Sequence, residues 1–226
     1  MGARTVLLTG GHGEIGAAIA RRFESAGDRV IAPRSAELDL ASPASVADWF
    51  AREAPAVGVL IHCAGLNRPR PFEQVDDDLL ARTLAVNALS FVDLARRCAP
   101  SLRAERGCVV AVSSIYGFMS RRGRLAYAMA KHALVGAVQT LALELGDDGV
   151  RVNSVSPGFI DTRMTRQNNP PEVVRGFEQR VPLGRLGRPD EVAEAAFFLC
   201  NPAAGFVNGH DLVIDGAYSI GGFQNP

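Results

Sequence analysis

Four polar side chains in the middle of the chain have the types and spacing of a proton-transfer site. Tyr127 and Lys131 are four residues apart in a segment with helical spacing, so they share one helix face. Ser113 and Ser114 follow the apolar run Cys108–Val112, which is typical of a strand buried on both faces. An ammonium group favours the phenolate of a neighbouring tyrosine, so we expect the pKa of Tyr127 to be lowered, as suits acid–base work on an alcohol/carbonyl pair. Surface pairs of tyrosine and lysine with this spacing are also common, so the spacing alone leaves both interpretations open.

A glycine-rich segment near the N-terminus has the pattern of a dinucleotide-binding turn. Leu8–Gly16 reads LTGGHGEIG and lies between an apolar run and a segment with helical spacing. In one register, Gly11, Gly13 and Gly16 match Gly-x-Gly-x-x-Gly, whose glycines let the backbone approach a pyrophosphate at a helix N-terminus. A second register places Glu14 against the phosphates. A tight turn without a ligand is the structural alternative for this pattern.

The residues after the second predicted strand bear on the choice of cofactor. In dinucleotide-binding folds an acid in this region binds the ribose 2′-hydroxyl of NAD, whereas an arginine accommodates the 2′-phosphate of NADP. Arg34 stands immediately after the strand, with Ser35 as a second phosphate donor, and Glu37 lies three residues later. The position of Arg34 favours NADP(H), while Glu37 keeps NAD(H) open. A solvated surface arginine is the alternative without a ligand.

Composition argues against several classes of function. The 226 residues suffice for one substantial core, and 24 basic residues balance 24 acidic ones, which gives no electrostatic footprint for nucleic acid or an anionic membrane. Four scattered cysteines, without a metal-ligand spacing, indicate neither a metal site nor a disulfide framework, and we expect buried thiols in a reducing compartment. The sequence has neither a signal-peptide pattern nor an apolar stretch of membrane-spanning length, so a cytoplasmic location is expected.

The hydrophobic pattern alternates short apolar runs with helical segments. This alternation predicts right-handed β-α-β units, and hence an α/β fold with one doubly wound, Rossmann-like parallel sheet, helices on both faces and a single domain over residues 1–226. Ser42 is predicted to cap a helix that has Pro43 at its first position, and a long helical region is expected to break near Pro100. The predicted strands are Thr5–Leu8, Arg29–Ala32, Val57–His62, Cys108–Val112, Val150–Val155 and Asp211–Ile214, and the predicted helices are Ile15–Ala26, Ser42–Glu53, Asp76–Leu102, Leu125–Leu145 and Pro189–Leu199.

The least regular segment lies at about residues 161–185 and is rich in proline, asparagine and arginine. A long irregular insertion in a compact domain is commonly a substrate lid, and a floppy surface loop is the alternative. The lid side chains considered for contact with an anionic or carrier-bound group are Arg163, Met164, Arg166, Phe177 and Arg180. Charged lid residues are more often simply solvated.

Several ordered motifs resemble those of the short-chain dehydrogenase/reductase family over essentially the whole chain. Ser114 lies thirteen residues before Tyr127, and Lys131 lies four residues after it, which is similar to the family's Ser–Tyr–Lys triad. Asn87 matches the asparagine that completes a catalytic tetrad. The other matching segments are TGGHGEIG at 9–16, HCAG at 62–65, RVNSVSPGFIDT at 151–162, and PLGRLGRPDEVAEAAFFL and GHDLVIDGAYS near the C-terminus, the last two resembling 3-oxoacyl-carrier-protein reductase-like members.

The resemblance implies a role for each of the four catalytic candidates. Ser114 would polarise the substrate carbonyl, Tyr127 would donate the proton, Lys131 would lower the tyrosine pKa and bind the nicotinamide ribose, and Asn87 would hold a water of a proton relay. The residues expected to contact the cofactor are Gly10, His12, Gly13, Glu14, Ile15, Gly16, Arg34, Ser35, Asp39, Leu40, Cys63, Ala64, Gly65, Tyr127, Lys131, Pro157, Gly158, Ile160 and Thr162.

Three departures from the family pattern concern the cofactor. Glu14 replaces the middle glycine of the loop; a carboxylate gains about 0.3–1 kcal/mol near a helix N-terminus but is repelled by a pyrophosphate by ~1 kcal/mol at 4 Å in water. His62 and Cys63 stand where the family has two asparagines. Only four residues separate Arg34 from Asp39, which matches a position after the family's third strand, so the usual helix has no room and we expect a shallow adenine side.

Together, the residues and the resemblance predict an NAD(P)H-dependent oxidoreductase that interconverts a ketone and a secondary alcohol by hydride transfer, with NADP(H) favoured. The alternative is a non-redox or regulatory relative with a weakened cofactor site. The expected partner is a small carbonyl or alcohol substrate, and a substrate bound to a carrier stays open as an alternative. Neither a metal ion, a nucleic acid nor a membrane is expected. The resemblance implies a homotetramer or homodimer with contacts through Leu125–Leu145 and the last strand.

Overall fold

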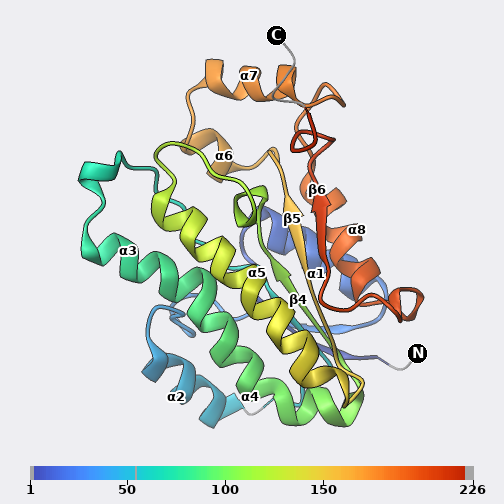
Figure 1. The fold of residues 1–226 in the computed structure, drawn as a ribbon. Helices are drawn as coiled ribbons and strands as arrows, with labels where there is room; N and C mark the ends of the chain where they lie inside the picture. Colours follow the sequence, from blue (N-terminus) through green and yellow to red (C-terminus); the bar gives the residue numbers. More distant parts are fainter. Residues whose placement is uncertain (1–2, 54, 222–226) are drawn as a thin grey trace.

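The computed structural model describes residues 3–53 and 55–221 and contains a six-stranded, entirely parallel sheet (Figure 1). The strand order is β2-β1-β3-β4-β5-β6. The order reverses between β1 and β3, and open α/β sheets bind ligands at the carboxyl edge of such a switch point. The strands are β1 (Thr5–Thr9), β2 (Arg29–Ile31), β3 (Val59–His62), β4 (Cys108–Val112), β5 (Arg151–Pro157) and β6 (Asp211–Ile214). The predicted doubly wound α/β fold is confirmed.

Helices cover both faces of the sheet, as Figure 1 shows. On one face, α1 and α8 pack together, with Phe23 of α1 edge-on to Phe197 of α8 at 5.1 Å between ring centroids. On the other face lie α2, α4 and α5. The bounds of these helices are α1 (Glu14–Ser25), α2 (Pro43–Glu53), α4 (Ser90–Glu105), α5 (Leu125–Gly146) and α8 (Pro189–Leu199).

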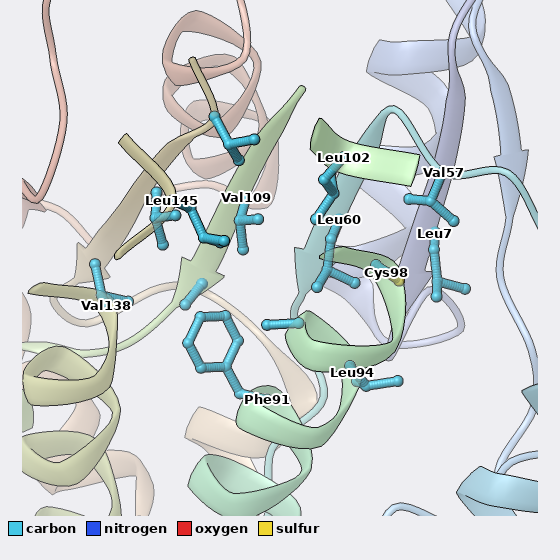
Figure 2. Packing of buried hydrophobic residues seen from close by; sticks show 14 of the residues in the cluster. Leu7, Val57, Leu60, Phe91, Leu94, Cys98, Leu102, Val109, Val138 and Leu145 are labelled. Atoms are coloured by element: carbon cyan, nitrogen blue, oxygen red, sulfur yellow. The ribbon is translucent and has the colours of Figure 1, made fainter. Parts of the chain in front are cut away.

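The core on the α4 and α5 face is built from aliphatic side chains around one aromatic ring. All five residues of β4 are buried, which explains its continuous apolar sequence. Figure 2 shows Leu7, Leu60 and Val109 of the sheet facing Phe91 of α4 and Val138 of α5. This packing fixes α5, the helix that carries Tyr127 and Lys131, against the centre of the sheet.

The predicted break of the long helical region near Pro100 is wrong. Helix α4 runs through Pro100, which is exposed, so its ring meets solvent at the cost of one backbone hydrogen bond. The regular helix is interrupted earlier, by a π-helical turn at Ala85–Leu89 that separates α3 (Asp77–Leu84) from α4. There the side-chain amide of Asn87 donates to the Thr83 carbonyl oxygen at 2.8 Å, the acceptor of an α-helical bond from the Asn87 backbone.

The segment 161–185, expected to be irregular, contains two short helices, α6 (Arg163–Gln167) and α7 (Pro171–Arg180). Val174 and Phe177 are buried against Leu186, an i, i+3 pair that the polar composition of the segment conceals. The strand that the resemblance places before Asp39 is absent, because residues 32–42 form turns between β2 and α2. None of the helices among the described residues is long and apolar enough to cross a membrane.

Candidate active site

A cleft of about 780 Å³ lies at the carboxyl edge of the sheet and crosses the switch point between β1 and β3. Its walls come from the residues that follow β1, β2, β3, β4 and β5, together with α5 and the segment around α6. Every predicted catalytic and cofactor-contacting residue lines this cleft except Asn87. The fold thus brings together side chains from across the first 162 residues.

The glycine turn has the shape of a phosphate-binding loop. Gly10 adopts a φ of +71°, and a Cβ there would lie 2.6 Å from the Ala64 backbone nitrogen. A Cβ on Gly16 would clash with the Gly10 carbonyl oxygen, whereas Gly13 has room for one. The turn closes with a 3.0 Å hydrogen bond from the Gly13 nitrogen to the Gly10 oxygen, and α1 starts at Glu14. Bare backbone at a helix N-terminus fits the pyrophosphate of a dinucleotide.

Glu14, the unexpected acid of the turn, reaches across to the segment 161–185. Its Oε2 accepts a 2.6 Å hydrogen bond from the backbone nitrogen of Arg163, at the start of α6. Thr162 caps the same helix through its hydroxyl, which accepts from the Thr165 nitrogen at 3.3 Å. The carboxylate therefore has a protein donor from a segment far away in the sequence.

Ser114, Tyr127 and Lys131 converge at the end of β4. The Lys131 side chain is 2% exposed, its Nζ donates to the Val112 carbonyl oxygen at 2.7 Å, and it lies 5.6 Å from the centre of the Tyr127 ring. Ser114 and Tyr127 both line the cleft, and the Ser114 Oγ accepts a hydrogen bond from the Tyr116 nitrogen at 3.2 Å. Ser113, beside it in the wall, has a buried hydroxyl without a protein partner.

The pKa of Tyr127 differs from the expectation. Desolvation raises it to about 12, against the opposing effects of the Ser114 hydrogen bond and the Arg124 charge. Burial also lowers the pKa of Lys131 to about 8, since the charged ammonium has lost its water. The predicted depression of the tyrosine pKa is therefore wrong for this state, in which Tyr127 is a neutral phenol and a proton donor.

The buried side chains of Asn87 and His62 connect segments of the chain beside the cleft through hydrogen bonds. Asn87 is fully buried; its Nδ2 donates to the Leu66 carbonyl at 3.0 Å, and its Oδ1 accepts from the Leu66 nitrogen at 3.3 Å. His62 Nδ1 lies 3.0 Å from the Thr9 hydroxyl and Nε2 lies 3.2 Å from the Val86 carbonyl, which fits a neutral ring that donates from Nε2. The two side chains join β1, β3 and the π-helical turn.

The end of the cleft at which the adenine was predicted to bind contains Arg34, Ser35, Asp39 and Leu40. Glu37, the rival ligand for a ribose hydroxyl, does not line the cleft; its Oε2 accepts from the Arg34 backbone nitrogen at 2.7 Å and so closes the turn. Arg34 is exposed. The residue favoured from the sequence therefore faces the cleft and its competitor does not.

Sequence reasoning missed the polar residues at the other end of the cleft. Arg124 is 6% exposed and donates to the side-chain oxygens of Asn67 at 2.9 Å and Asn169 at 3.2 Å. Its place three residues before Tyr127, directly ahead of the predicted helix, is a signal that the sequence offered. Phe159 was also missed; its ring stacks on Phe177 at 3.8 Å.

The lid residues that were considered for substrate contact divide into two groups. Arg163 and Met164 line the cleft. Phe177 is buried beneath Phe159, and Arg166 forms an ion pair with Asp161 at 2.5 Å. Phe177, Arg166 and Arg180 are not among the residues that line the cleft.

Comparisons with known proteins agree with the fold. Residues 33–219 match a family model described as enoyl-(acyl carrier protein) reductase. The chain is 30% identical to 2,5-dichloro-2,5-cyclohexadiene-1,4-diol dehydrogenase of Sphingobium indicum, over 98% of both chains. It is 32% identical to the 3-oxoacyl-[acyl-carrier-protein] reductase of Chlamydia trachomatis, over 74% of this chain and 67% of that protein. A structure of 4-hydroxyisoleucine dehydrogenase complexed with NADH is similar with a TM-score of 0.91 and 26% identity, over 96% of this chain and 99% of that chain.

The chain therefore belongs to the short-chain dehydrogenase/reductase family, as its motifs suggested. It is an oxidoreductase of the nicotinamide-dependent kind. The glycine turn, Tyr127 and Lys131 line one cleft at the carboxyl edge of the parallel sheet.

We expect His62 to make the protein sensitive to acid. Burial, with a further effect of the Lys131 charge, lowers its pKa from 6.5 to about 3. Between these values the unfolded chain binds a proton that the folded chain cannot bind, so the free energy of unfolding falls by up to about 1.4 kcal/mol per pH unit as the pH drops below 6.5. Urea unfolding at pH 7, 6, 5 and 4 should show a shallower loss for His62→Asn than for the wild type.

The matched control for this prediction is His210→Asn, which removes an exposed histidine. Its pH dependence should follow that of the wild type. Parallel curves for the wild type and His62→Asn would contradict the buried neutral state of His62.

Proposed function

We propose that the protein interconverts a ketone and a secondary alcohol with a nicotinamide cofactor, and that it prefers NADP(H). The observation that carries the proposal is the convergence of Ser114, Tyr127 and Lys131 on the cleft that the glycine turn also lines. The named relatives support it, because their names describe a diol dehydrogenase, an oxoacyl reductase and a hydroxy-amino-acid dehydrogenase.

In the reductive direction the chain's own groups act on the carbonyl oxygen. Ser114 donates a hydrogen bond to that oxygen and holds it beside the Tyr127 hydroxyl. Tyr127, a neutral phenol in this environment, transfers its proton to the oxygen as negative charge develops there. In the oxidative direction the phenolate removes the proton from the alcohol, and a positive charge near Tyr127 is then needed to lower its pKa.

The residues that would hold the cofactor lie along the rest of the cleft. The turn Gly10–Gly16 would bind the pyrophosphate, and Lys131 the ribose next to the nicotinamide. When bound, the reduced cofactor supplies a hydride, which adds to the carbonyl carbon. Arg34 and Ser35 would bind a 2′-phosphate, and the engagement of Glu37 with the Arg34 backbone supports a preference for NADP(H).

The contact of Glu14 weakens the case for a protein without redox chemistry. That alternative rests on Glu14, Cys63 and the short adenine side, and of these Glu14 has a protein donor in the Arg163 backbone nitrogen. The short adenine side remains a departure, since residues 32–42 form only turns. A complete catalytic set favours the redox function over a regulatory one.

The proposal includes self-association and a small substrate that enters beside α6. Large apolar side chains that are exposed occur on α5 and around β6, the two regions that the resemblance assigns to subunit contacts. They are Leu125, Met129, Leu143, Phe206, Val213 and Ile220. A homotetramer or homodimer would bury them.

Tyr127→Phe should lower kcat for ketone reduction by roughly 10²- to 10⁴-fold, because it removes the proton donor. Loss of absorbance of NADPH or NADH with a panel of cyclic and linear ketones measures this, and kcat/KM should be higher with NADPH. Tyr218→Phe removes a phenol hydroxyl outside the cleft and should retain activity. Turnover by Tyr127→Phe at more than a tenth of the wild-type rate would contradict the mechanism, and no oxidation of either cofactor would favour the non-redox alternative.

Glu14→Gln should tighten NADPH binding by roughly 3- to 10-fold. The change removes a negative charge near the pyrophosphate, worth ~1 kcal/mol at 4 Å in water, and keeps an oxygen that accepts from Arg163. Titration of cofactor fluorescence gives the Kd. The control is Glu24→Gln, which removes an exposed charge from the same helix. Unchanged or weaker binding of NADPH by Glu14→Gln would show that the carboxylate does not oppose the cofactor.

A further inference from the structure

Arg124 is a buried cation without a buried anion. It lies immediately before α5 and is 6% exposed, yet it forms no salt bridge with a carboxylate of the described residues. Two neutral oxygens, from Asn67 and Asn169, accept from its Nη1 and Nη2. Buried charges in proteins are normally paired, because desolvation of an unpaired guanidinium is costly.

The surroundings of Arg124 point to a missing acid. Burial lowers the pKa of Arg124, and the ionisable groups that influence it are Arg121, Tyr116 and Tyr127, none of which is a carboxylate. Arg121 also lines this part of the cleft, and its guanidinium lies 4.9 Å from the centre of the Phe177 ring. An anionic group beside Arg124 would raise its pKa again and offset the desolvation.

The acids that line the cleft are occupied elsewhere. Only Glu14 and Asp39 among the lining residues carry a carboxylate. Glu14 accepts from the Arg163 nitrogen, and Asp39, at the adenine end, accepts from the Ala41 nitrogen at 2.9 Å. The end of the cleft that contains Tyr127 and Arg124 is therefore lined by cations and neutral groups alone.

We infer that the substrate is an oxo acid or hydroxy acid whose carboxylate binds the guanidinium of Arg124 while its carbonyl or hydroxyl group meets Ser114 and Tyr127. The inference rests on the proposed function and adds the substrate class to it. Arg124 and Tyr127 line the same cleft and each influences the pKa of the other, so one compact molecule can meet both side chains. A planar guanidinium, fixed by Asn67 and Asn169, suits a carboxylate because two N–H groups match its two oxygens.

A purely structural role is the competing explanation for Arg124. Its two hydrogen bonds connect the loop after β3, through Asn67, with the segment between α6 and α7, through Asn169. A structural link of this kind would affect charged and neutral substrates alike. A carboxylate-binding group would affect the charged ones selectively.

The test compares oxo acids with their methyl esters in the wild type, Arg124→Gln and Arg124→Lys. Linear acids with the ketone at C2, C3 or C4 cover the spacing between the two groups. For the best acid, the wild type should prefer acid over ester in kcat/KM by at least about 10-fold. Arg124→Gln should lose roughly 10- to 100-fold with the acid and change less than about threefold with the ester, and Arg124→Lys should be intermediate.

Arg122→Gln is the matched control, since Arg122 is exposed on the same segment and does not line the cleft. It should keep the preference for the acid. Turnover of the esters by Arg124→Gln also serves as the check on folding. Equal losses with acid and ester, or a wild type without a preference for any acid, would overturn the inference and leave the proposed function standing.

Calorimetric titration of the same acids and esters separates the two claims. If no ketone is turned over by the wild type, the proposed function fails, and the binding data still decide the inference. Tighter binding of an acid than of its ester, lost in Arg124→Gln, supports the carboxylate site. Equal binding of acid and ester by the wild type contradicts it.

Discussion

The structure depends on a buried ammonium group at the end of the central strand. Lys131 is almost fully enclosed, and its Nζ is held by the carbonyl oxygen of Val112. A parallel strand buried on both faces leaves its last carbonyls at the carboxyl edge, where α5 delivers the lysine and, one turn earlier, Tyr127. Burying the Lys131 ammonium group costs free energy of folding, because the charge loses its water. Hydrogen bonds from a bound ligand to this group would offset that cost. Strand order, core packing and the helix spacing all serve this juxtaposition.

Cationic side chains line the cleft at three separate places, and two nearby carboxylates are held by protein donors. Arg34 lies after β2, Lys131 on α5 and Arg124 just before α5. Glu37 closes a turn and Glu14 binds the start of α6, so neither carboxylate is left without a protein donor. This distribution suits a long anionic ligand followed by a second, smaller anion. A contact also connects the glycine turn with the segment 161–185, because Glu14 accepts a hydrogen bond at the start of α6.

Much of this arrangement was predictable, because apolar runs and residue spacing are local properties. The six strands follow from short apolar segments such as Cys108–Val112, and the shared face of Tyr127 and Lys131 follows from helix geometry. The helix break was not predictable, since it depends on the Asn87 side chain replacing a backbone donor, and Pro100 is tolerated only because it faces solvent. The pKa of Tyr127 was misjudged for a related reason: desolvation is a property of the folded site, and it exceeds the influence of one neighbouring charge.

The most direct test of the account is to follow the hydride. The wild type is incubated with NADPH deuterated at C4 of the dihydronicotinamide, in each of the two stereochemical forms, and with the ketones and oxo acids described above; the product alcohol is then analysed by mass spectrometry and NMR. The account predicts deuterium on the carbinol carbon from one of the two forms, with one alcohol produced for each cofactor oxidised. Cofactor oxidation without deuterated alcohol, or no alcohol from any ketone or oxo acid, would contradict the assignment of this cleft as a redox site.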